Sequence, residues 1–493
     1  METKKILSVL LLSFLPFLTI QAQNWLQNGQ NLVGADDENF GTSVSLSSDG
    51  SVLAIGAPWH FNSTNESVGR VSIYKNQSGI WTKIGQDIEG EADQEGFGIA
   101  VSLSSNGLVV AIMDMNFPGR VRIFENQDEA WVQTGQDIDD EISNTGSSGS
   151  TEVLSLNFDG SILAIGTPGN DGNGYRSGHV RIFENQAETW VQTGQDIDGD
   201  AANDHFGTSV SLSYDGSIVA IGAPGNNGSG EDAGHVRIYE YQNETWVQTG
   251  QDIDGEAAND WFGTSISLSS NGSIVAIGAP GNSENGYISG HARIYENQNG
   301  GWSQIGLDLD GKTNEDYFGK SVSLSSDGRI VAIGAPDHTD YTGQARVYEN
   351  INNTWTPLGQ DIEGEGEDFF GSSLSLSSNG SIVAIGAPLY SDFTNGTVGN
   401  VRVFSFGSSG ISSNFRNNQL SLHPNPTTGK LSLTVPTESI GNILVLDIFG
   451  KHVLLNKTNK KCETIDLSPF ECGIYTIRVQ TKNETFTTKI IKR

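Results

Sequence analysis

Cysteine is nearly absent from this sequence: its 493 residues include only Cys462 and Cys472. Both lie close to the C-terminus, so everything before them must be stable without disulfides. The spacing of the two cysteines allows a disulfide between them. A sequence does not show the distance and orientation of the two side chains, which decide whether the disulfide forms.

Basic residues are also scarce, with 27 Lys and Arg against 59 Asp and Glu. Residues 24–419 hold 15 basic and 52 acidic groups, a net charge of −37, whereas residues 420–493 carry +4. A field of that sign repels nucleic acid and anionic membranes and favours solubility, cations or basic partners. We therefore expect no nucleic-acid partner.

Long apolar runs are missing except at the N-terminus. Lys4 and Lys5 precede an apolar core at residues 6–20, and a small-residue cleavage site ends at Ala22. This run is shorter than the about 20 apolar residues that cross a bilayer. The pattern predicts a signal peptide over residues 1–22 and an exported chain without a transmembrane segment.

Helical periodicity is absent, and an internal repeat is present instead. The pattern Ser-Val-Ser-Leu-Ser, or a close variant, recurs seven times, and an Asp-Gly or Asn-Gly pair follows each copy. Such pairs are typical of two-residue hairpin turns in which both residues have positive φ. The first apolar residues of the seven copies are Val44, Val101, Leu154, Val210, Ile266, Val322 and Leu374.

One unit, residues 206–253, shows the content of a repeat. Turn residues divide it into four predicted strands at 208–213, 217–221, 235–239 and 246–253. The second strand is apolar without interruption, which indicates burial on both faces, as in radially stacked sheets. Seven such units predict an all-β, monomeric, seven-bladed β-propeller over residues 24–406.

The ends of the repeat region predict how the ring closes. Six units contain a Trp in the fourth strand, whereas the last unit stops after Phe404 without one. A seventh Trp, Trp25, lies before the first unit. Residues 24–32 should therefore complete the last blade, which would leave no open edge in the ring.

The stretch FGTSVSLSSDGSVLAIGAP at residues 40–58 resembles the FG-GAP repeats of integrin α-chain propellers and of bacterial surface proteins. The resemblance covers residues 24–406. Two units depart from it: Ser150-Thr151 replaces Phe-Gly, and Met113-Asp114-Met115 replaces Gly-Ala-Pro. The calcium loop of integrin-type repeats is not carried over, because an Asp-Gly turn supplies too few oxygen ligands.

The C-terminal segment resembles the type IX secretion sorting domain. The motifs are HPNPTTGKLSL (423–433), LDIFGK (446–451), IDLSPFECGIYTIRV (465–479) and KIIKR (489–493). The resemblance implies a small, Ig-like β-sandwich over residues 420–493, recognised by the type IX secretion machinery. It places the protein outside a Gram-negative cell, secreted or on the outer surface. Strands are expected at 431–435, 443–448 and 474–479, after a flexible linker at 407–419.

Two sets of side chains are candidates for ligand binding near the mouth of the central channel. An acid lies two residues before the Phe of each Phe-Gly pair, and four units place a ring-bearing residue between the two. Aromatic rings beside carboxylates suit sugars or a cationic partner. In the alternative, the acids bond to their own loops and the rings pack on neighbouring blades. The acids are Glu38, Glu95, Asp204, Asp260, Asp316 and Asp368, and the rings are His205, Trp261, Tyr317 and Phe369.

Metal ligands are not predicted. The loops at residues 196–200 and 252–256 resemble fragments of calcium loops, so Ca2+ is the alternative to solvated turns there. His179, His235 and His291 occupy one repeat position on three blades, where a strand-end hydrogen bond is favoured over a shared metal. The repeated Arg residues, such as Arg181, are expected to pair with acids such as Glu184 or Asp196.

These features predict a surface protein that binds or adheres to a carbohydrate or a protein through its loop face. The sequence contains no nucleophile elbow, zinc-binding His pair or phosphate loop, so no catalytic residue and no cofactor are predicted. A glycan-active hydrolase or lyase on the propeller is the alternative function.

Overall fold

The structure, a computed structural model, forms two compact units, residues 1–408 and 409–493. The signal peptide, linker residues 409–419, Ser150-Thr151 and Cys472 lie outside the described residues, so the disulfide stays a prediction. The described residues are 23–115, 119–139, 153–389, 391–392, 396–408, 421–423, 429–434, 442–446, 451–458, 460–470, 473–481 and 485–492.

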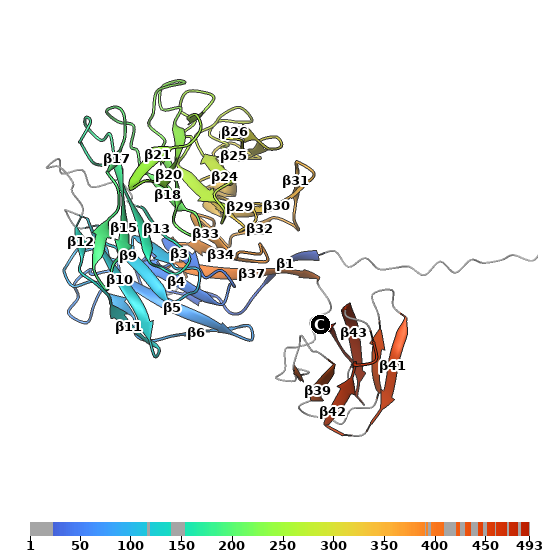
Figure 1. The fold of residues 1–493 in the computed structure, drawn as a ribbon. Helices are drawn as coiled ribbons and strands as arrows, with labels where there is room; N and C mark the ends of the chain where they lie inside the picture. The colour runs from blue at the N-terminus through green and yellow to red at the C-terminus, as the bar shows by residue number, and fades with distance from the viewer. Residues whose placement is uncertain are drawn as a thin grey trace, which may run out of the picture. The chain divides into compact units, whose positions relative to one another are not determined.

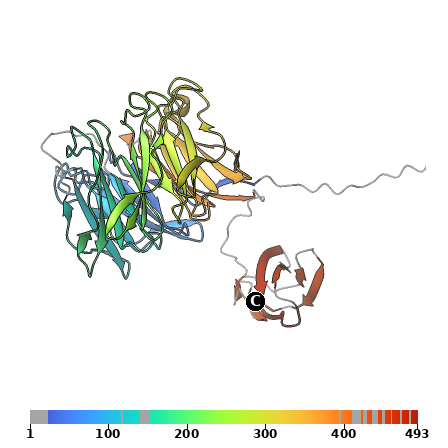
Figure 2. The same cartoon turned by 45° about the horizontal axis from the view of Figure 1, so that its top comes forward.

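The described strands of the first unit build seven antiparallel sheets arranged as blades around an axis (Figure 1), which confirms the predicted all-β propeller. In blade 4 the order is β18 (Ser209–Leu212), β19 (Ile218–Ala223), β20 (His235–Gln242) and β21 (Thr245–Gln248). The short β22 (Ile253–Asp254) pairs with β20 as well. Figure 2 shows the same ring tilted.

The other blades repeat this order. Blade 1 comprises β3 (Ser43–Leu46), β4 (Val52–Ala57), β5 (Arg70–Gln77), β6 (Ile80–Lys83) and β7 (Ile88–Glu89); blade 2, β8 (Ala100–Leu103), β9 (Val109–Met113), β10 (Arg120–Gln127), β11 (Ala130–Gln133) and β12 (Ile138–Asp139); blade 3, β13 (Val153–Leu156), β14 (Ile162–Thr167), β15 (His179–Asn185), β16 (Trp190–Gln192) and β17 (Ile197–Asp198). Blade 5 comprises β23 (Ser265–Leu268), β24 (Ile274–Ala279), β25 (His291–Gln298), β26 (Gly301–Gln304) and β27 (Leu309–Asp310); blade 6, β28 (Ser321–Leu324), β29 (Ile330–Ala335), β30 (Gln344–Ile351), β31 (Thr354–Pro357) and β32 (Ile362–Glu363); blade 7, β33 (Ser373–Leu376), β34 (Ile382–Ala387), β37 (Asn400–Ser408), β1 (Gln23–Gln27) and β2 (Leu32–Val33). Outside the blades lie the pair β35 (Ser391–Asp392) and β36 (Gly396–Thr397) and one helical turn, α1 (His338–Tyr341).

The fourth strand of each blade is interrupted, which corrects the continuous strand expected at residues 246–253. Between β21 and β22, Gly250 has φ +77°, and a Cβ there would lie 2.8 Å from Cδ1 of Trp302 in the next blade. Trp302 donates its indole N–H to the carbonyl of Thr249 at 3.2 Å. The interruption therefore makes room for the Trp of the neighbouring blade.

The turn between the first two strands is longer than the two-residue hairpin turn that the Asp-Gly pairs suggested. In blade 4, Gly216 has positive φ and Asp215 does not, and Gly216 donates to the carbonyl of Ser213 at 3.0 Å. The Asp215 carboxylate accepts the Ser213 hydroxyl at 2.8 Å and the Ser217 N–H at 3.0 Å. These side-chain bonds support a four-residue loop of type I shape.

Apolar side chains fill the space between blades on both faces of each second strand. Val219 and Ile221 of β19 pack with Ile182 of blade 3, whereas Ala220 packs with Ile266 of blade 5. Val219, Ala220 and Ile221 have no exposed surface. Burying a Val or Ile side chain contributes about 1.5–3 kcal/mol, so the uninterrupted apolar strands supply most of the adhesion between blades.

Serine side chains join the innermost strands of neighbouring blades. In blade 4, Ser211 accepts the N–H of Leu268 from blade 5 at 3.0 Å, and Ser209 donates to the carbonyl of Gly263 at 2.7 Å. The first of these bonds recurs at every blade junction. Its serine acceptors are Ser45, Ser102, Ser155, Ser211, Ser267, Ser323 and Ser375.

The N-terminal strand completes blade 7. β1 pairs antiparallel with β37, with Trp25 opposite Phe406, and the two lie side by side in Figure 1. Trp25 is 6% exposed and donates to the carbonyl of Leu358 in blade 6 at 2.7 Å. The start and the end of the repeat region therefore share one sheet.

Deleting residues 24–33 should expose the edge of β37 and remove the burial of Trp25, lowering stability by at least about 3 kcal/mol and causing aggregation. Thermal denaturation and size-exclusion chromatography measure both effects. A monomeric deletion variant that melts at the wild-type temperature would contradict the closure.

The second unit consists of two sheets. One contains β38 (Ser421–His423), β39 (Lys430–Thr434) and β42 (Cys462–Asp466), and the other contains β41 (His452–Lys457), β40 (Asn442–Leu446), β43 (Gly473–Gln480) and β44 (Thr485–Lys492). The three expected strands correspond to β39, β40 and β43 with shifted ends, and the other four were not predicted. The buried side chains of this unit form one separate core: Leu431, Leu433, Ile443, Val445, Ile465, Leu467, Tyr475, Ile477 and Val479.

Within the ranges given above, no helix has both the length and the apolar character needed to cross a membrane.

Candidate binding face of the propeller

The loops between second and third strands are tied to the loops that enter the next blade. Trp261, just before blade 5, donates its N–H to the carbonyl of Asp232 in blade 4 at 3.1 Å, and Phe262 forms a bridge with Gly234. The equivalent bonds join His205 to Arg176, Tyr317 to Ile288 and Phe369 to Tyr341. All of these loops therefore lie at one end of the propeller, here called the loop face.

The repeated acids lie inside these loops, which corrects the expectation that they line the channel mouth. The six carboxylate residues are at most 2% exposed. Asp204 accepts the N–H of Ala201 at 3.1 Å, and Asp260 accepts that of Ala257 at 3.0 Å. Asp316 and Asp368 bond to backbone N–H groups in the same way. A short acidic side chain at this position caps its own loop, because the buried N–H groups need an acceptor.

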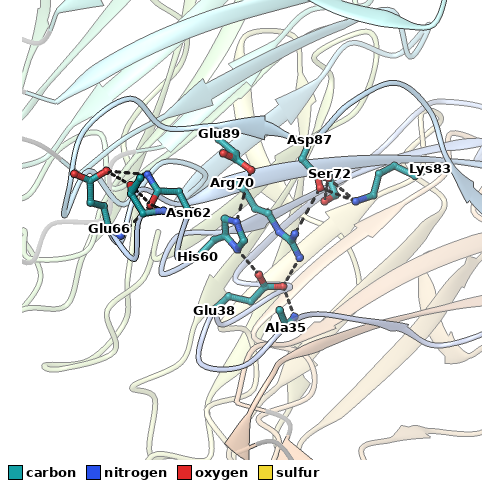
Figure 3. A network of polar contacts seen from close by, with 11 residues as sticks. Ala35, Glu38, His60, Asn62, Glu66, Arg70, Ser72, Lys83, Asp87 and Glu89 are labelled. Atoms are coloured by element: carbon teal, nitrogen blue, oxygen red, sulfur yellow. Dashed lines mark hydrogen bonds and ion pairs between the residues drawn. The ribbon is translucent and has the colours of Figure 1, made fainter.

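Glu38 in blade 1 shows how such an acid joins several elements (Figure 3). Its carboxylate accepts a hydrogen bond from the Ala35 N–H at 2.6 Å and another from the guanidinium of Arg70 at 2.7 Å. It also lies 2.9 Å from Nδ1 of His60. Burial alone would raise the pKa of Glu38, but the His60 hydrogen bond and the Arg70 charge outweigh it and lower the pKa. Arg70 also pairs with Asp87 at 3.5 Å. Glu38 therefore holds its loop and the blade together.

Asp368 in blade 7, like Asp260 before blade 5, has a carboxyl group whose pKa is raised by burial. Burial raises the pKa of Asp368 to about 6, since the N–H groups of Glu365 and Phe370 and the charge of Arg402 offset only part of the desolvation. Both N–H groups are 3.2 Å from the carboxylate. Because the folded pKa exceeds the usual value of 3.8, the native state binds protons more tightly than the unfolded chain. Stability should therefore fall as pH rises from about 4 to about 6.

Asp368→Asn should stabilise the protein at pH 7.5 by up to about 3 kcal/mol, since it removes the cost of ionising a buried carboxyl group. At pH 4 the gain should vanish. Thermal denaturation at both pH values measures the difference. Asp316→Asn is the control, because the pKa of Asp316 is lowered and its substitution should destabilise at pH 7.5. The same loss of stability for both variants at both pH values would contradict the assignment.

The ring-bearing residues next to the acids have an unusual backbone. His205, Trp261, Tyr317 and Phe369 are half-buried, with φ of 54°, 53°, 52° and 55°. Blades 1 and 2 have Asn39 and Gly96 in the same left-handed conformation, φ 52° and 61°. Asn and Gly tolerate this region, whereas bulky side chains are rarely found there.

Two further tyrosines extend this set, and sequence reasoning missed both. Tyr287 is 63% exposed and Tyr341 is 49% exposed. Tyr341 stacks on Phe369, with ring centroids 5.0 Å apart. Partial burial raises the pKa of Tyr317, and the charges of Asp337 and Glu315 and the nearby Tyr287 and Tyr341 add to that shift.

The Tyr341–Phe369 stack and the electrostatic influence of Tyr287 and Tyr341 on Tyr317 place these four rings in one region, here called the aromatic patch: Tyr287, Tyr317, Tyr341 and Phe369. Asp337 and Glu315 also act on Tyr317 through their charge. Trp261 and His205 lie on the preceding blades. The available signal was an aromatic residue in a Gly/Ser-rich loop, as in GNSENGYISG (281–290), which holds Tyr287.

The loops that resemble calcium-loop fragments bind arginine instead. Arg237 donates to both oxygens of Asp252, at 3.0 and 2.8 Å, and also contacts Asp200 from the preceding blade. Arg293 bonds to Asp308 at 2.7 Å and contacts Glu256 in the same way. Arg181 donates to the carbonyl of Asp139 at 3.0 Å.

Each repeated histidine lies close to two acids. The ligand atoms lie within 4.8 Å of one another in three groups, each formed within a blade or with the blade before it. His291 is fully buried, and burial together with the Arg293 charge lowers its pKa to about 4. In the second group Arg237 pairs with Asp252, and in the third Arg293 pairs with Glu256 and Asp308, so these groups carry no metal assignment. The groups are His179, Asp196 and Asp198; His235, Asp252 and Asp254; and Glu256, His291 and Asp308.

Two protein families match the sequence. The family described as "Secretion system C-terminal sorting domain" matches residues 421–493, and "FG-GAP repeat" matches residues 190–239 and 253–295. The chain thus carries FG-GAP repeats followed by a type IX secretion sorting domain, as predicted. This domain indicates a secreted or surface protein of a Gram-negative bacterium.

Among curated proteins, none matches the sequence. Among solved structures, the chain is similar to the periplasmic gluconolactonase of Pseudomonas aeruginosa, with 16% identity, 66% of this chain and 85% of that chain covered, and a TM-score of 0.47. The β-propeller domain of Cps50 (Swd1) from Myceliophteria thermophila shows 11% identity, 78% and 99% coverage, and a TM-score of 0.49.

Proposed function

We propose that this exported propeller binds a carbohydrate or protein ligand outside the cell through the aromatic patch and the neighbouring ring of Trp261 on its loop face. The observation that carries the proposal is the placement of Trp261, Tyr317 and Phe369 at a left-handed backbone position that Asn39 and Gly96 occupy elsewhere. A bulky residue there costs about 1 kcal/mol or more. Four successive blades have a ring-bearing residue there despite this cost in free energy, which favours a role for the rings beyond packing.

The chemistry of the patch suits two classes of ligand. Exposed tyrosines stack on the C–H faces of sugars, and their hydroxyls bond to sugar hydroxyls. Asp337 and Glu315 beside Tyr317, within a propeller region of charge −37, attract cationic groups and so favour a basic protein surface. Both classes remain part of the proposal.

We propose binding without turnover. A glycosidase needs two carboxyl groups that face the bond to be cleaved. The repeated acids next to the rings are buried and accept backbone N–H groups of their own loops, which disfavours the alternative of a glycan-active enzyme. Incubation of the chain with each glycan that it binds, followed by product analysis, tests this part, and any cleavage product would establish the enzyme instead.

Replacing Trp261, Tyr317 or Phe369 by Asn gives each blade the residue of blade 1. Stability should stay equal or rise by about 0.5–1 kcal/mol, because Asn tolerates positive φ. Binding on a glycan array and on immobilised extracellular proteins should fall at least about tenfold, since stacked rings are lost. Leu307→Gln, at an exposed position between β26 and β27, is the control. Unchanged binding by all three variants would refute the proposed site.

Removing residues 420–493 should abolish surface delivery and leave the propeller folded. Among the described residues, the apolar core of the second unit is formed by side chains within 431–479, separate from the cores of the blades. Cell fractionation should find the truncated protein in the periplasm, with a melting temperature within about 2 °C of the propeller transition of the full chain. Surface delivery without the segment would show that the address lies elsewhere.

A further inference from the structure

At the end of the channel opposite the loop face, one residue from each turn between the first two strands of a blade contributes to a ring. Their backbones bond around the axis: Tyr214 donates to Ser270 at 2.8 Å, Ser270 to Ser326 at 3.0 Å and Ser378 to Ser48 at 2.8 Å. In blade 2 the neighbouring Asn106 makes the bond, to Phe158 at 3.3 Å. The seven positions are Ser48, Ser105, Phe158, Tyr214, Ser270, Ser326 and Ser378, here called the turn ring.

The turn ring surrounds a cavity of about 150 Å3. Leucines at the ends of the inner strands, among them Leu212 and Leu324, also line it. Because the backbone groups of the ring bond to one another, the serine hydroxyls are the polar groups left for a ligand. Within the described part of the chain, those five hydroxyls make no hydrogen bond of their own. The cavity thus offers a mostly polar surface with a hydroxyl rim, and leucine side chains form the apolar part of its lining.

Phe158 and Tyr214 break the repeat at this position. Their rings stack with centroids 4.3 Å apart and an interplanar angle of 22°, and Tyr214 stays 47% exposed. Serine occupies this position in the other five blades and donates the same backbone bond in four of them, so joining blades does not require aromatic rings here. Both rings line the cavity, which gives one side of it an aromatic wall.

We propose that this cavity binds a single sugar ring. A pyranose has C–H faces that pack on aromatic and leucine side chains, and hydroxyls that bond to a serine rim. The volume is below the about 300–1,000 Å3 of pockets for larger ligands and close to that of a cavity that holds one six-membered ring. The site is independent of the loop face, so either proposal can fail alone.

Tyr214→Ser and Phe158→Ser test the site, because each introduces the residue that five blades already have and should fold normally. NMR titration of the full chain with the methyl glycosides of glucose, galactose, mannose and N-acetylglucosamine should give saturable shifts with at least one of them. Each variant should weaken that binding by at least about tenfold. Ser326→Leu, which fills the cavity from another blade, should abolish it.

Leu307→Gln, which lies outside both proposed sites, is the matched control and should leave these shifts unchanged. Saturable binding that persists at wild-type strength in Tyr214→Ser and Ser326→Leu would overturn the proposal, as would no saturable shift with any of the four glycosides. Loss of the same shifts in Trp261→Asn would assign the sugar to the loop face and also overturn it.

Discussion

The innermost strands of neighbouring blades share no backbone ladder, and the serine bond between them is the constraint on which the ring depends. At each junction a leucine N–H donates to the serine that directly precedes the equivalent leucine of the blade before, as Leu268 does to Ser211. A buried N–H must find an acceptor. The bond therefore fixes the position of each blade along the propeller axis relative to the next blade. After seven such junctions, β33 of the last blade is bonded to β3 of the first blade in the same register.

Both ends of the channel follow from that register. At one end, equal heights allow the inner turns to bond around the axis through residues such as Ser270 and Ser326. At the other end, the Phe-Gly segment of each blade meets the loop of the blade before it, and the buried acids cap the resulting loops. The polar residues of the repeat thus form hydrogen bonds that hold the blades and loops together. Side chains that depart from it, such as Tyr214 and Tyr317, are those left for ligands.

The charged side chains are also paired locally, between neighbouring blades. The propeller has a large acidic excess, yet the arginines of the third strands are placed where acids of two blades converge, as Arg237 is between Asp252 and Asp200. A guanidinium can bond to several carboxylates at once. At Asp260 and Asp368 burial outweighs the hydrogen-bonding partners and raises the pKa, which reaches about 6 at Asp368. The Asp368 carboxyl group makes blade 7 sensitive to pH.

The sequence by itself determined the number of blades, the closing role of Trp25 and the sorting domain, because spacing and composition are properties of the chain alone. It also indicated the rings at Trp261 and Tyr317. Only the tertiary structure decided that Asp204 and Asp316 point inward, that Gly250 interrupts the fourth strand for Trp302, and that Tyr287 and Tyr341 join the aromatic patch. These outcomes depend on contacts between neighbouring blades, and a carboxylate takes its partner from whichever loop the packing brings within hydrogen-bonding distance.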